Sequence, residues 1–404
     1  MMRSLYSGVS GLKVHQTKMD VIGNNIANVN TVGFKGSTVT FSDVFYQTTQ
    51  SASGANAETG SAGRNAIQIG LGSGLSAVTT NVSTAGGSQR TDNPFDCMIS
   101  GDGFFIVNSG GTNYFTKNGS FKVDSAGTLC TSSGANVMGW QPDADGNIVK
   151  AQVSSLKILS PENLYAEPEA TTQSYIKGNI NKNDSQVTGS SGYPAQVAFY
   201  DNLGTSYTAK LAIKSTTTNG QYTVSVTDIV SGDDSIFTTY DATNKVYKKT
   251  DISTFAFGGV TYTVKLDDTA TGAISITPAS TTTLAFDASN GTFSGIYTGG
   301  TATNDTSIKL DLSAAVSDLK TGNPFSTSGV TIDFSNTTQY SAKSNLESTK
   351  GDTSGVGAGL PVGNMTGVSI DTSGKIYGTY DNGTNKLLGQ IAVATFANPA
   401  GLEA

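Results

Sequence analysis

Apolar residues recur at helical spacing near the start of the chain. Between residues 3 and 29 they are separated by 4, 3, 7, 3, 4 and 3 positions, which predicts one stripe of a helix with a near-heptad repeat. A helix of this length would be about 40 Å long, so it needs a partner along its length. Three internal glycines disfavour the isolated helix, and we expect it to fold on assembly. The stripe consists of Leu5, Val9, Leu12, Met19, Ile22, Ile26 and Val29.

The pattern changes after this helix. From Thr38 to Arg90 the chain is rich in Ser, Thr, Ala and Gly, and residues 48–65 contain almost no side chain that could be buried. This composition is typical of a linker or an extended surface segment. From residue 95 to 140, short apolar runs are broken by Gly-Asp-Gly, Ser-Gly-Gly and Lys-Asn-Gly, which are hairpin signals.

Two distant stretches share one scheme of alternating apolar residues, Asp, two small residues, Gly and a second strand. They are "SFKVDSAGTLCT" (120–131) and "GVSIDTSGKIYG" (367–378), and we interpret them as hairpins of one sheet-rich domain. The intervening block is rich in Thr, with period-2 alternation from Tyr207 to Ile213 and from Val260 to Leu266. It resembles an inserted β domain, single or divided in two, which the chain would enter near Trp140 and leave near Gly355.

The predicted fold class is therefore mainly β, with an N-terminal axial α-helix, an extended linker, and a discontinuous β domain carrying a large inserted β domain. The expected ranges are 1–30 for the helix, 31–90 for the linker, 91–145 with 346–404 for the discontinuous domain, and 146–345 for the insert. A length of 404 residues is sufficient for several such domains.

Composition narrows the class of partner. Charged residues make up 14% of the chain, against roughly 25% in ordinary soluble domains, and the net charge is −7 without Lys/Arg clusters. This balance argues against nucleic acid or an anionic membrane surface as a partner. The N-terminus has no continuous apolar core of a cleavable signal peptide, so an exported chain would use another route.

Candidate catalytic chemistry is sparse. His15 is the single histidine and has no nucleophile motif beside it, while "GLGSGLS" (70–76) lacks the remaining features of a phosphate-binding loop. "DADGN" (143–147) has no acidic residue at the twelfth position of a calcium loop. Cys97 and Cys130 are either two free thiols or one disulfide. We predict no catalytic, cofactor-binding or metal-ligating residue, and no enzyme.

Three blocks, in order, resemble a known family. "MDVIGNNIANVNTVGFKGSTVTFSDVF" (19–45) resembles the N-terminal signature of bacterial flagellar rod and hook proteins. "SGDGFFIV" (100–107) with residues 114–140, and "VSIDTSGKIYGTYDNGTNKLLGQIAVATFANPAGLE" (368–403), resemble its later blocks. The large insert points to hook rather than distal rod proteins, as do residues 197–214 and 331–340, which resemble hook-protein segments.

The resemblance implies a structural subunit of an extracellular, flexible hook tube that transmits torque from the motor to the filament. It implies export by the flagellar type III apparatus without a cleaved signal. The implied partners are further copies of the chain, the distal rod protein, the hook cap protein and the hook-filament junction protein. The family also has a C-terminal segment beyond "NPAGLE", so we expect this chain to be truncated.

We predict that the stripe residues Leu5, Val9, Leu12, Met19, Ile22 and Ile26 pack between subunits rather than on their own domain. The family motif after the helix is expected to form a hinge-like exit, with Phe34 anchoring the extended segment. Its residues are Asn25, Asn28, Thr31, Gly33, Phe34 and Lys35. The alternatives are a distal rod protein, a secreted β-rich adhesin that binds glycans through the middle block, and a hydrolase using two carboxylates.

Overall fold

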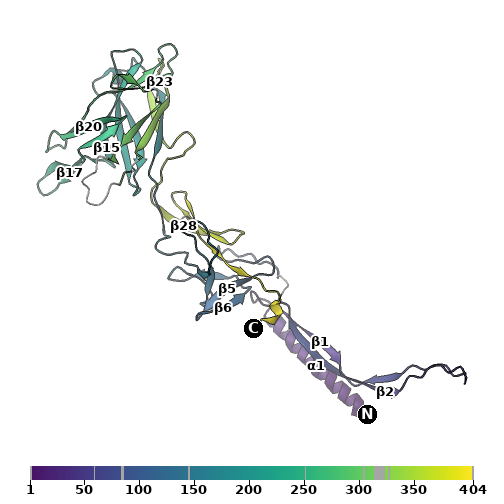
Figure 1. The fold of residues 1–404 in the computed structure, drawn as a ribbon. Coiled ribbons are helices and arrows are strands. Elements are labelled where there is room, and N and C mark those ends of the chain that lie inside the picture. Colours follow the sequence, from purple (N-terminus) through teal and green to yellow (C-terminus); the bar gives the residue numbers. More distant parts are fainter. Residues whose placement is uncertain are drawn as a thin grey trace. The chain divides into compact units, whose positions relative to one another are not determined.

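The computed structural model describes residues 2–58, 60–82, 86–143, 146–250, 252–303, 305–313, 324–325 and 328–402. Over these residues the protein is mainly β with one long N-terminal helix, as the sequence predicts (Figure 1). The chain divides into two compact units. Unit 1 comprises Met1–Leu164, Gly367–Thr379 and Asn385–Ala404, and unit 2 comprises Tyr165–Thr366 and Tyr380–Thr384.

Unit 1 begins with helix α1 (Met2–Ala27), which lies beside a two-stranded ribbon. The ribbon pairs β1 (Ser37–Asp43) antiparallel with β4 (Ser73–Thr80), and continues where β2 (Tyr46–Gln50) pairs with β3 (Ile67–Gly70). The predicted linker is thus a long hairpin whose tip contains the polar stretch from 51 to 66. The sequence "GLGSGLS" forms the end of β3, the start of β4 and the two residues between them, whose backbone groups hydrogen-bond Val44 and Phe45.

The remainder of unit 1 is built on a sheet in the order β28-β29-β30-β9-β5-β31, with β6, β7, β8 and β10 paired at its sides. Alternate apolar residues form its core, including Phe105, Phe121, Val137 and Ile376. The strands are β5 (Phe104–Ser109), β6 (Thr112–Thr116), β7 (Phe121–Val123), β8 (Leu129–Thr131), β9 (Asn136–Trp140), β10 (Ser154–Ser155), β28 (Gly363–Ile370), β29 (Lys375–Tyr380), β30 (Asn385–Ile391) and β31 (Val393–Ala394), followed by the 3-10 helix η2 (Pro399–Gly401).

Both hairpins inferred from the shared sequence scheme are present. Strands β7 and β8 pair antiparallel from Phe121↔Thr131 to Val123↔Leu129, and β28 neighbours β29 in the sheet. In each turn an aspartate, Asp124 or Asp371, accepts hydrogen bonds from backbone amides two and four residues later. This conformation explains why Asp recurs before the small residues and Gly in both stretches.

The chain enters unit 2 at Tyr165 rather than near Trp140 or residue 146. The intervening residues belong to unit 1 because Leu156 and Ile158 are both 1% exposed, and their backbone amides donate to Val137 and Gly127. At the other boundary, β27 (Asn345–Lys350) pairs with β12 (Gln173–Asn179) in unit 2. The return to unit 1 therefore falls at Gly367, beyond both Gly355 and the predicted boundary at 345/346.

Unit 2 contains two large sheets. One has the order β21-β20-β19-β25-β26-β12-β27, and the other β13-β14-β15-β22-β23-β24, with β16 paired to β15. Strands β17 and β18 form a separate hairpin, and β11 pairs with Gly363 and Asn364, the part of β28 that belongs to unit 2. The elements not yet given are β11 (Tyr165–Ala166), α2 (Ser185–Thr188), β13 (Tyr193–Tyr200), β14 (Ser206–Ser215), β15 (Gln221–Ser231), β16 (Asp234–Ser235), β17 (Thr238–Asp241), β18 (Val246–Lys249), β19 (Thr254–Phe257), β20 (Val260–Leu266), β21 (Ile274–Pro278), β22 (Thr282–Phe286), β23 (Phe293–Thr298), β24 (Thr301–Ala302), β25 (Ser307–Asp311) and β26 (Val330–Thr338).

One hydrophobic core joins the two sheets of unit 2. It includes Leu211 and Ile213 from one sheet and Val260, Tyr262 and Val264 from the other. These residues belong to the two alternating stretches that predicted strands, and the structure has strands β14 and β20 there. Because both sheets contribute to the same core, the described part of the insert is one structural unit, with the sheets packed as in β-sandwiches.

Candidate functional site

Helix α1 presents one side to the β1–β4 ribbon. Val14 is buried to 6% exposure on this side. The His15 ring meets Phe41 of β1 edge-to-face, with centroids 5.6 Å apart, and Lys18 Nζ lies 5.7 Å from the Phe41 centroid. The histidine is therefore an aromatic packing partner for Phe41 in this structure, one position along the helix from the buried valine.

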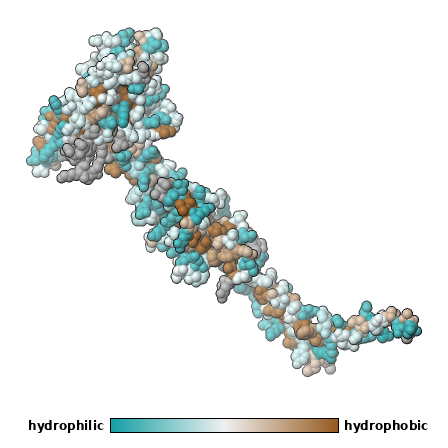
Figure 2. Space-filling model, in the orientation of Figure 1, coloured by the Kyte–Doolittle hydropathy of each residue, from teal (hydrophilic) through white to brown (hydrophobic). Residues whose placement is uncertain are grey.

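The predicted stripe lies on the other side of α1 and is exposed. Since successive helical residues rotate by about 100°, most of its residues project away from the side that carries Val14, while Ile22 lies about 80° around the helix from it. Figure 2 shows hydrophobic residues along the part of unit 1 that contains α1 and the ribbon. The exposed fractions are Leu5 65%, Val9 56%, Leu12 74%, Met19 66%, Ile22 38% and Ile26 67%. A row of large apolar side chains on one chain is a mark of an interaction surface.

The end of α1 is tied to the ribbon by an asparagine. Asn25 Nδ2 donates to the backbone carbonyl of Ser37 at 2.9 Å, and the Ser37 amide donates to Asn25 Oδ1 at 3.1 Å. The side-chain amide thus pairs with the first residue of β1 as a neighbouring strand would. Asn28 caps the helix differently, with Nδ2 donating to the Asn24 carbonyl at 3.0 Å. The asparagines of the motif satisfy backbone groups where the helix ends.

The chain then turns through Thr31 to Phe34. The Phe34 amide donates to the Thr31 carbonyl at 3.2 Å, and Thr31 Oγ1 hydrogen-bonds Asn28 Oδ1 at 3.1 Å. Gly33 has φ +80°, and a Cβ there would lie 3.1 Å from the Asn118 backbone nitrogen. The turn therefore requires glycine both for its left-handed backbone and for the close approach of the β6–β7 connection.

A cavity of about 770 Å³ lies beside this turn within unit 1. Its walls come from residues 29–35, 86–99 and 117–120. Burial lowers the pKa of the Lys35 ammonium, and the positive charge of Lys117 lowers it further. Phe34 is half-buried in the segment between the helix end and β1.

The ribbon carries further exposed apolar side chains, distributed over both of its faces, that the sequence interpretation missed. They are Val44 47%, Phe45 74%, Tyr46 59%, Ile67 53%, Ile69 50% and Leu75 47% exposed. The available signal was the presence of these large residues at either end of a stretch otherwise made of Ser, Thr, Ala and Gly. A two-stranded ribbon is marginal by itself, so exposed apolar side chains on it favour a covering partner.

Cys97 and Cys130 are both free thiols, and burial, followed by the charge of Asp96, raises the pKa of Cys97 to about 11. A thiol with a raised pKa is a weak nucleophile at neutral pH. No group of three His, Cys, Asp or Glu residues within the described ranges is placed to hold a metal ion. Asp145 of "DADGN" lies outside the described residues.

None of the helices in the described part of the chain is long and apolar enough to cross a membrane.

Two family models match the chain over the elements described above. Residues 5–35, covering α1 and the turn after it, match the flagella basal body rod protein family. Residues 98–174 match the D1 domain of the flagellar hook proteins FlgE/F/G. The helix, the turn and the first strands thus define the class of the protein, a component of the bacterial flagellar axis.

Relatives over the full length identify the protein more closely. The chain is 32% identical to flagellar hook protein FlgE of Treponema pallidum, covering 100% of this chain and 83% of that protein. It is 30% identical to FlgE of Borreliella burgdorferi, covering 100% of this chain and 82% of that protein. The chain belongs to the flagellar hook protein family and is a structural subunit of the hook.

The rod protein alternative is less favoured. The flagellar basal-body rod protein FlgG of Bacillus subtilis is 51% identical, but over 34% of this chain and 51% of that protein. The match thus covers the shared elements and leaves most of the chain without a counterpart. Among solved structures, Helicobacter pylori flagellar hook protein FlgE2 matches 78% of this chain and 92% of that chain at 15% identity, with a TM-score of 0.32.

Proposed function

We propose that subunits polymerise through the stripe on α1, which becomes buried between copies in the tube. The observation that carries this proposal is the exposure of the stripe, from 38% at Ile22 to 74% at Leu12, on the side of α1 away from the ribbon. Burying a large apolar side chain contributes about 1.5–3 kcal/mol, so six together contribute on the order of 10 kcal/mol before the entropy of association. A contact of this kind is tight and insensitive to salt.

The ribbon extends the same contact. Its exposed residues, such as Phe45 and Ile67, offer a second apolar surface to a neighbouring copy. Asn25 links α1 to the start of β1, so the stripe and the ribbon would enter the assembly as one piece. The turn at Gly33 would then serve as the exit from this inner piece toward the β body, with Phe34 as an anchor.

The outer β body is suited to a flexible joint. Only 14% of the chain is charged, and the ion pairs of unit 2 are few in the described residues. Neutral polar surfaces exchange wet contacts at little cost, whereas desolvated ion pairs are expensive to break. We infer that inner helices hold the subunits permanently while the outer units slide, so the tube bends as it transmits torque to the filament.

The remaining parts of the proposal follow from the family. The chain would leave the cell through the flagellar type III export apparatus without a cleaved signal peptide, and would function outside the cell. Its proposed neighbours are the distal rod protein, the hook cap protein and the hook-filament junction protein. The stable, structural role proposed here requires no catalytic group.

The test is to place a charge in the stripe. Leu12→Glu should abolish polymerisation, because a carboxylate cannot be buried unpaired in an apolar contact. Hooks would be counted by electron microscopy in cells whose only hook protein is the variant, with a drop of at least tenfold expected. The purified variant should keep the thermal midpoint and helicity of the unmodified chain, since Leu12 is exposed before assembly.

The matched control is Lys13→Glu, which adds the same acid at the next position, exposed and outside the stripe. It should leave the number of hooks within twofold of the unmodified chain. Normal hooks with Leu12→Glu would contradict the proposed contact. An equal loss with both variants would show that added negative charge on α1, rather than the stripe, is what assembly cannot tolerate.

A further inference from the structure

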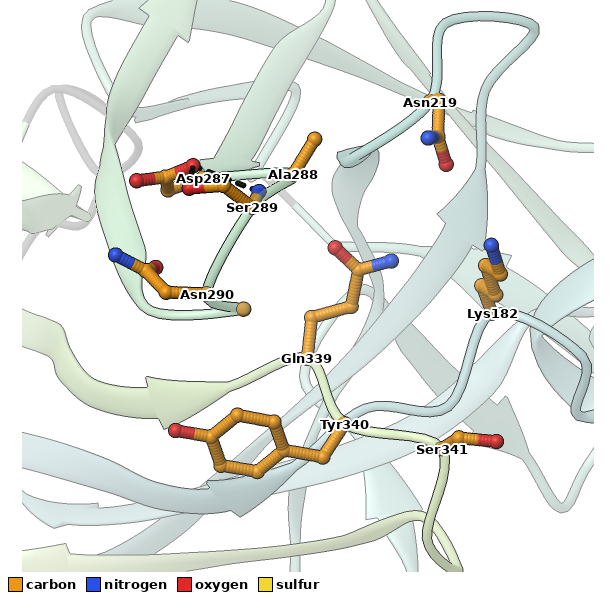
Figure 3. A pocket seen from close by; sticks show the side chains of 10 residues that line it. Lys182, Asn219, Asp287, Ala288, Ser289, Asn290, Gln339, Tyr340 and Ser341 are labelled. Atoms are coloured by element: carbon orange, nitrogen blue, oxygen red, sulfur yellow. Dashed lines mark hydrogen bonds between the residues drawn. The ribbon is translucent and has the colours of Figure 1, made fainter.

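Four connections of unit 2 converge on a small pocket. They are the β12–α2, β14–β15, β22–β23 and β26–β27 loops, and they enclose about 290 Å³ (Figure 3). In Figure 3, the segment carrying Gln339 and Tyr340 faces the loop carrying Asp287 and Asn290, with Asn219 and Lys182 on the remaining side. The proposed polymer contact on α1 uses none of these residues.

One wall of the pocket is held rigidly by a buried asparagine. Asn179 is 8% exposed, and its Oδ1 accepts a hydrogen bond from the Tyr340 amide at 2.6 Å. Its Nδ2 donates to the carbonyls of Tyr340 and Ala342, both at 3.1 Å. The position of Tyr340 is thereby set from inside the domain, while its ring remains 49% exposed.

The opposite wall is equally ordered. The Gly291 amide donates to the Asp287 carbonyl at 2.8 Å, and the Gln339 amide donates to the Gly291 carbonyl at 2.7 Å, which joins the two walls. Asp287 Oδ1 accepts from the Ser289 amide at 2.8 Å, and Asn290 Oδ1 accepts from the Thr292 amide at 2.9 Å. A pocket whose walls are fixed in advance loses little conformational freedom when it binds a ligand.

The side chains lining the pocket carry three amides, two serine hydroxyls, one cation, one anion and one aromatic ring. Asn290 uses its oxygen within its own loop, which leaves Nδ2 as a donor. The Tyr222 hydroxyl, which is buried in the core of unit 2, has no hydrogen-bond partner of good geometry in the described chain. Burial raises the pKa of Tyr222 to about 12, against a smaller opposing effect of the nearby Gln339 side chain.

We propose that this pocket binds one ring of a neutral carbohydrate, which packs against Tyr340 and hydrogen-bonds the Asn219 and Gln339 amides. Amide side chains both donate and accept, as sugar hydroxyls do, and a tyrosine ring offers an apolar face to the C–H groups of the sugar. Lys182 and Asp287 balance in charge, so the pocket has no net attraction for an anion. Its volume is just below the usual range for small-molecule sites, which fits one ring rather than a longer chain.

The experiment is saturation-transfer NMR on the full chain with glucose, galactose, mannose, N-acetylglucosamine and N-acetylneuraminic acid. At least one neutral sugar should show transfer and a Kd in the millimolar range, about −4 kcal/mol. Tyr340→Ala and Asn219→Ala should each weaken that Kd at least fivefold. Both residues are exposed, so the thermal midpoints of the variants should match that of the unmodified chain.

Tyr240→Ala is the matched control, because Tyr240 is also a half-exposed tyrosine of unit 2, at 52%, but belongs to the β17–β18 hairpin. It should leave the Kd unchanged. The proposal is overturned if no neutral sugar shows transfer, if only N-acetylneuraminic acid binds, or if Tyr240→Ala weakens binding as much as Tyr340→Ala does. None of these results bears on assembly through α1.

Discussion

Helix α1 with its ribbon and the core of unit 2 use similar apolar residues in opposite ways. In unit 2, alternating residues such as Val224, Phe257 and Ile332 are at most 1% exposed, because two sheets contribute side chains to one core. On α1, the periodic residues Leu5 and Leu12 are 65% and 74% exposed, since one side of the helix is the only side the ribbon covers. Periodicity predicts an apolar face, while the fold decides whether that face becomes a core or an interface.

Replacing one phenylalanine by alanine in each region should give the largest difference in the free energy of unfolding. Phe255 is 1% exposed and lies between the rings of Phe237 and Tyr262, at centroid distances of 5.7 and 5.1 Å. Phe255→Ala should lower the free energy of unfolding of unit 2 by about 3–5 kcal/mol, the usual effect of emptying an aromatic site. Hydrogen exchange of β19 and β20 during urea titration measures this loss.

The counterpart is Phe45→Ala on the ribbon, where the ring is 74% exposed. Its effect on the unassembled chain should stay within about 0.5 kcal/mol, as for ordinary surface substitutions. Trp140 is the single tryptophan and lies in unit 1, so its fluorescence follows unit 1 separately. If the two substitutions lowered the free energy of unfolding equally, the Phe45 side chain would be covered within the chain. The two regions would then not differ in the way proposed.

The sequence predicted elements with a clear period and missed those defined by pairing. The heptad spacing from Leu5 to Ile26 predicted α1, and the alternation in β14 and β20 predicted strands that the structure confirms. The ribbon was missed although β1 alternates in burial, because β3 shows no alternation and each strand pairs with a partner about 20 to 40 residues away. The local pattern of apolar and polar residues does not reveal which distant strand a segment pairs with.

The predicted boundaries of the inserted domain differ from those of unit 2 for a related reason. The change in composition after Trp140 suggested a domain boundary, but Leu156 and Ile158 still pack in unit 1. Burial of two isolated apolar residues leaves no periodic signal. Likewise, the paired hydrogen bonds between Asn25 and Ser37 explain part of the asparagine-rich motif, but only the structure shows which backbone the amide reaches. The predicted roles of the stripe and the turn in assembly stay predictions.

A pair of glycine substitutions should have smaller effects of opposite sign within unit 1. Gly33→Ala should loosen the turn after α1 by about 1–2 kcal/mol, because alanine is disfavoured at φ +80° and its Cβ would press on Asn118. Gly8→Ala should stabilise α1 by about 1 kcal/mol, since a Cβ there meets no atom within 4 Å. Hydrogen exchange of residues 31–34 tests the first, and far-UV circular dichroism tests the second.

An increase in stability with Gly33→Ala would contradict the requirement for a left-handed residue in the turn. A loss of helicity with Gly8→Ala would mean that the glycines of α1 are needed for contacts inside the single chain. The comparison between regions would then need revision, because the exposed side of α1 would have a partner within unit 1.

Acid should loosen the β17–β18 hairpin of unit 2 and leave the contacts of α1 unchanged. This is the smallest of the predicted effects. In the β17–β18 hairpin, the Lys248 ammonium lies 2.6 Å from Asp241 Oδ2, and its hydrogen bond, followed by that of Asn244, lowers the pKa of Asp241. A lowered pKa in the folded state means that this stabilisation is present above the unfolded value of about 4 and is lost as the pH falls further. The protection of the amides in residues 238–249, taken relative to their intrinsic exchange rates, should therefore fall below about pH 4, and Asp241→Asn should remove that dependence. The α1 stripe contains only Leu, Val, Met and Ile, so contacts made through it should persist over the same range. Acid-induced loss of those contacts at the pH that loosens the hairpin would show that charge, and not apolar burial alone, holds α1 to its partner.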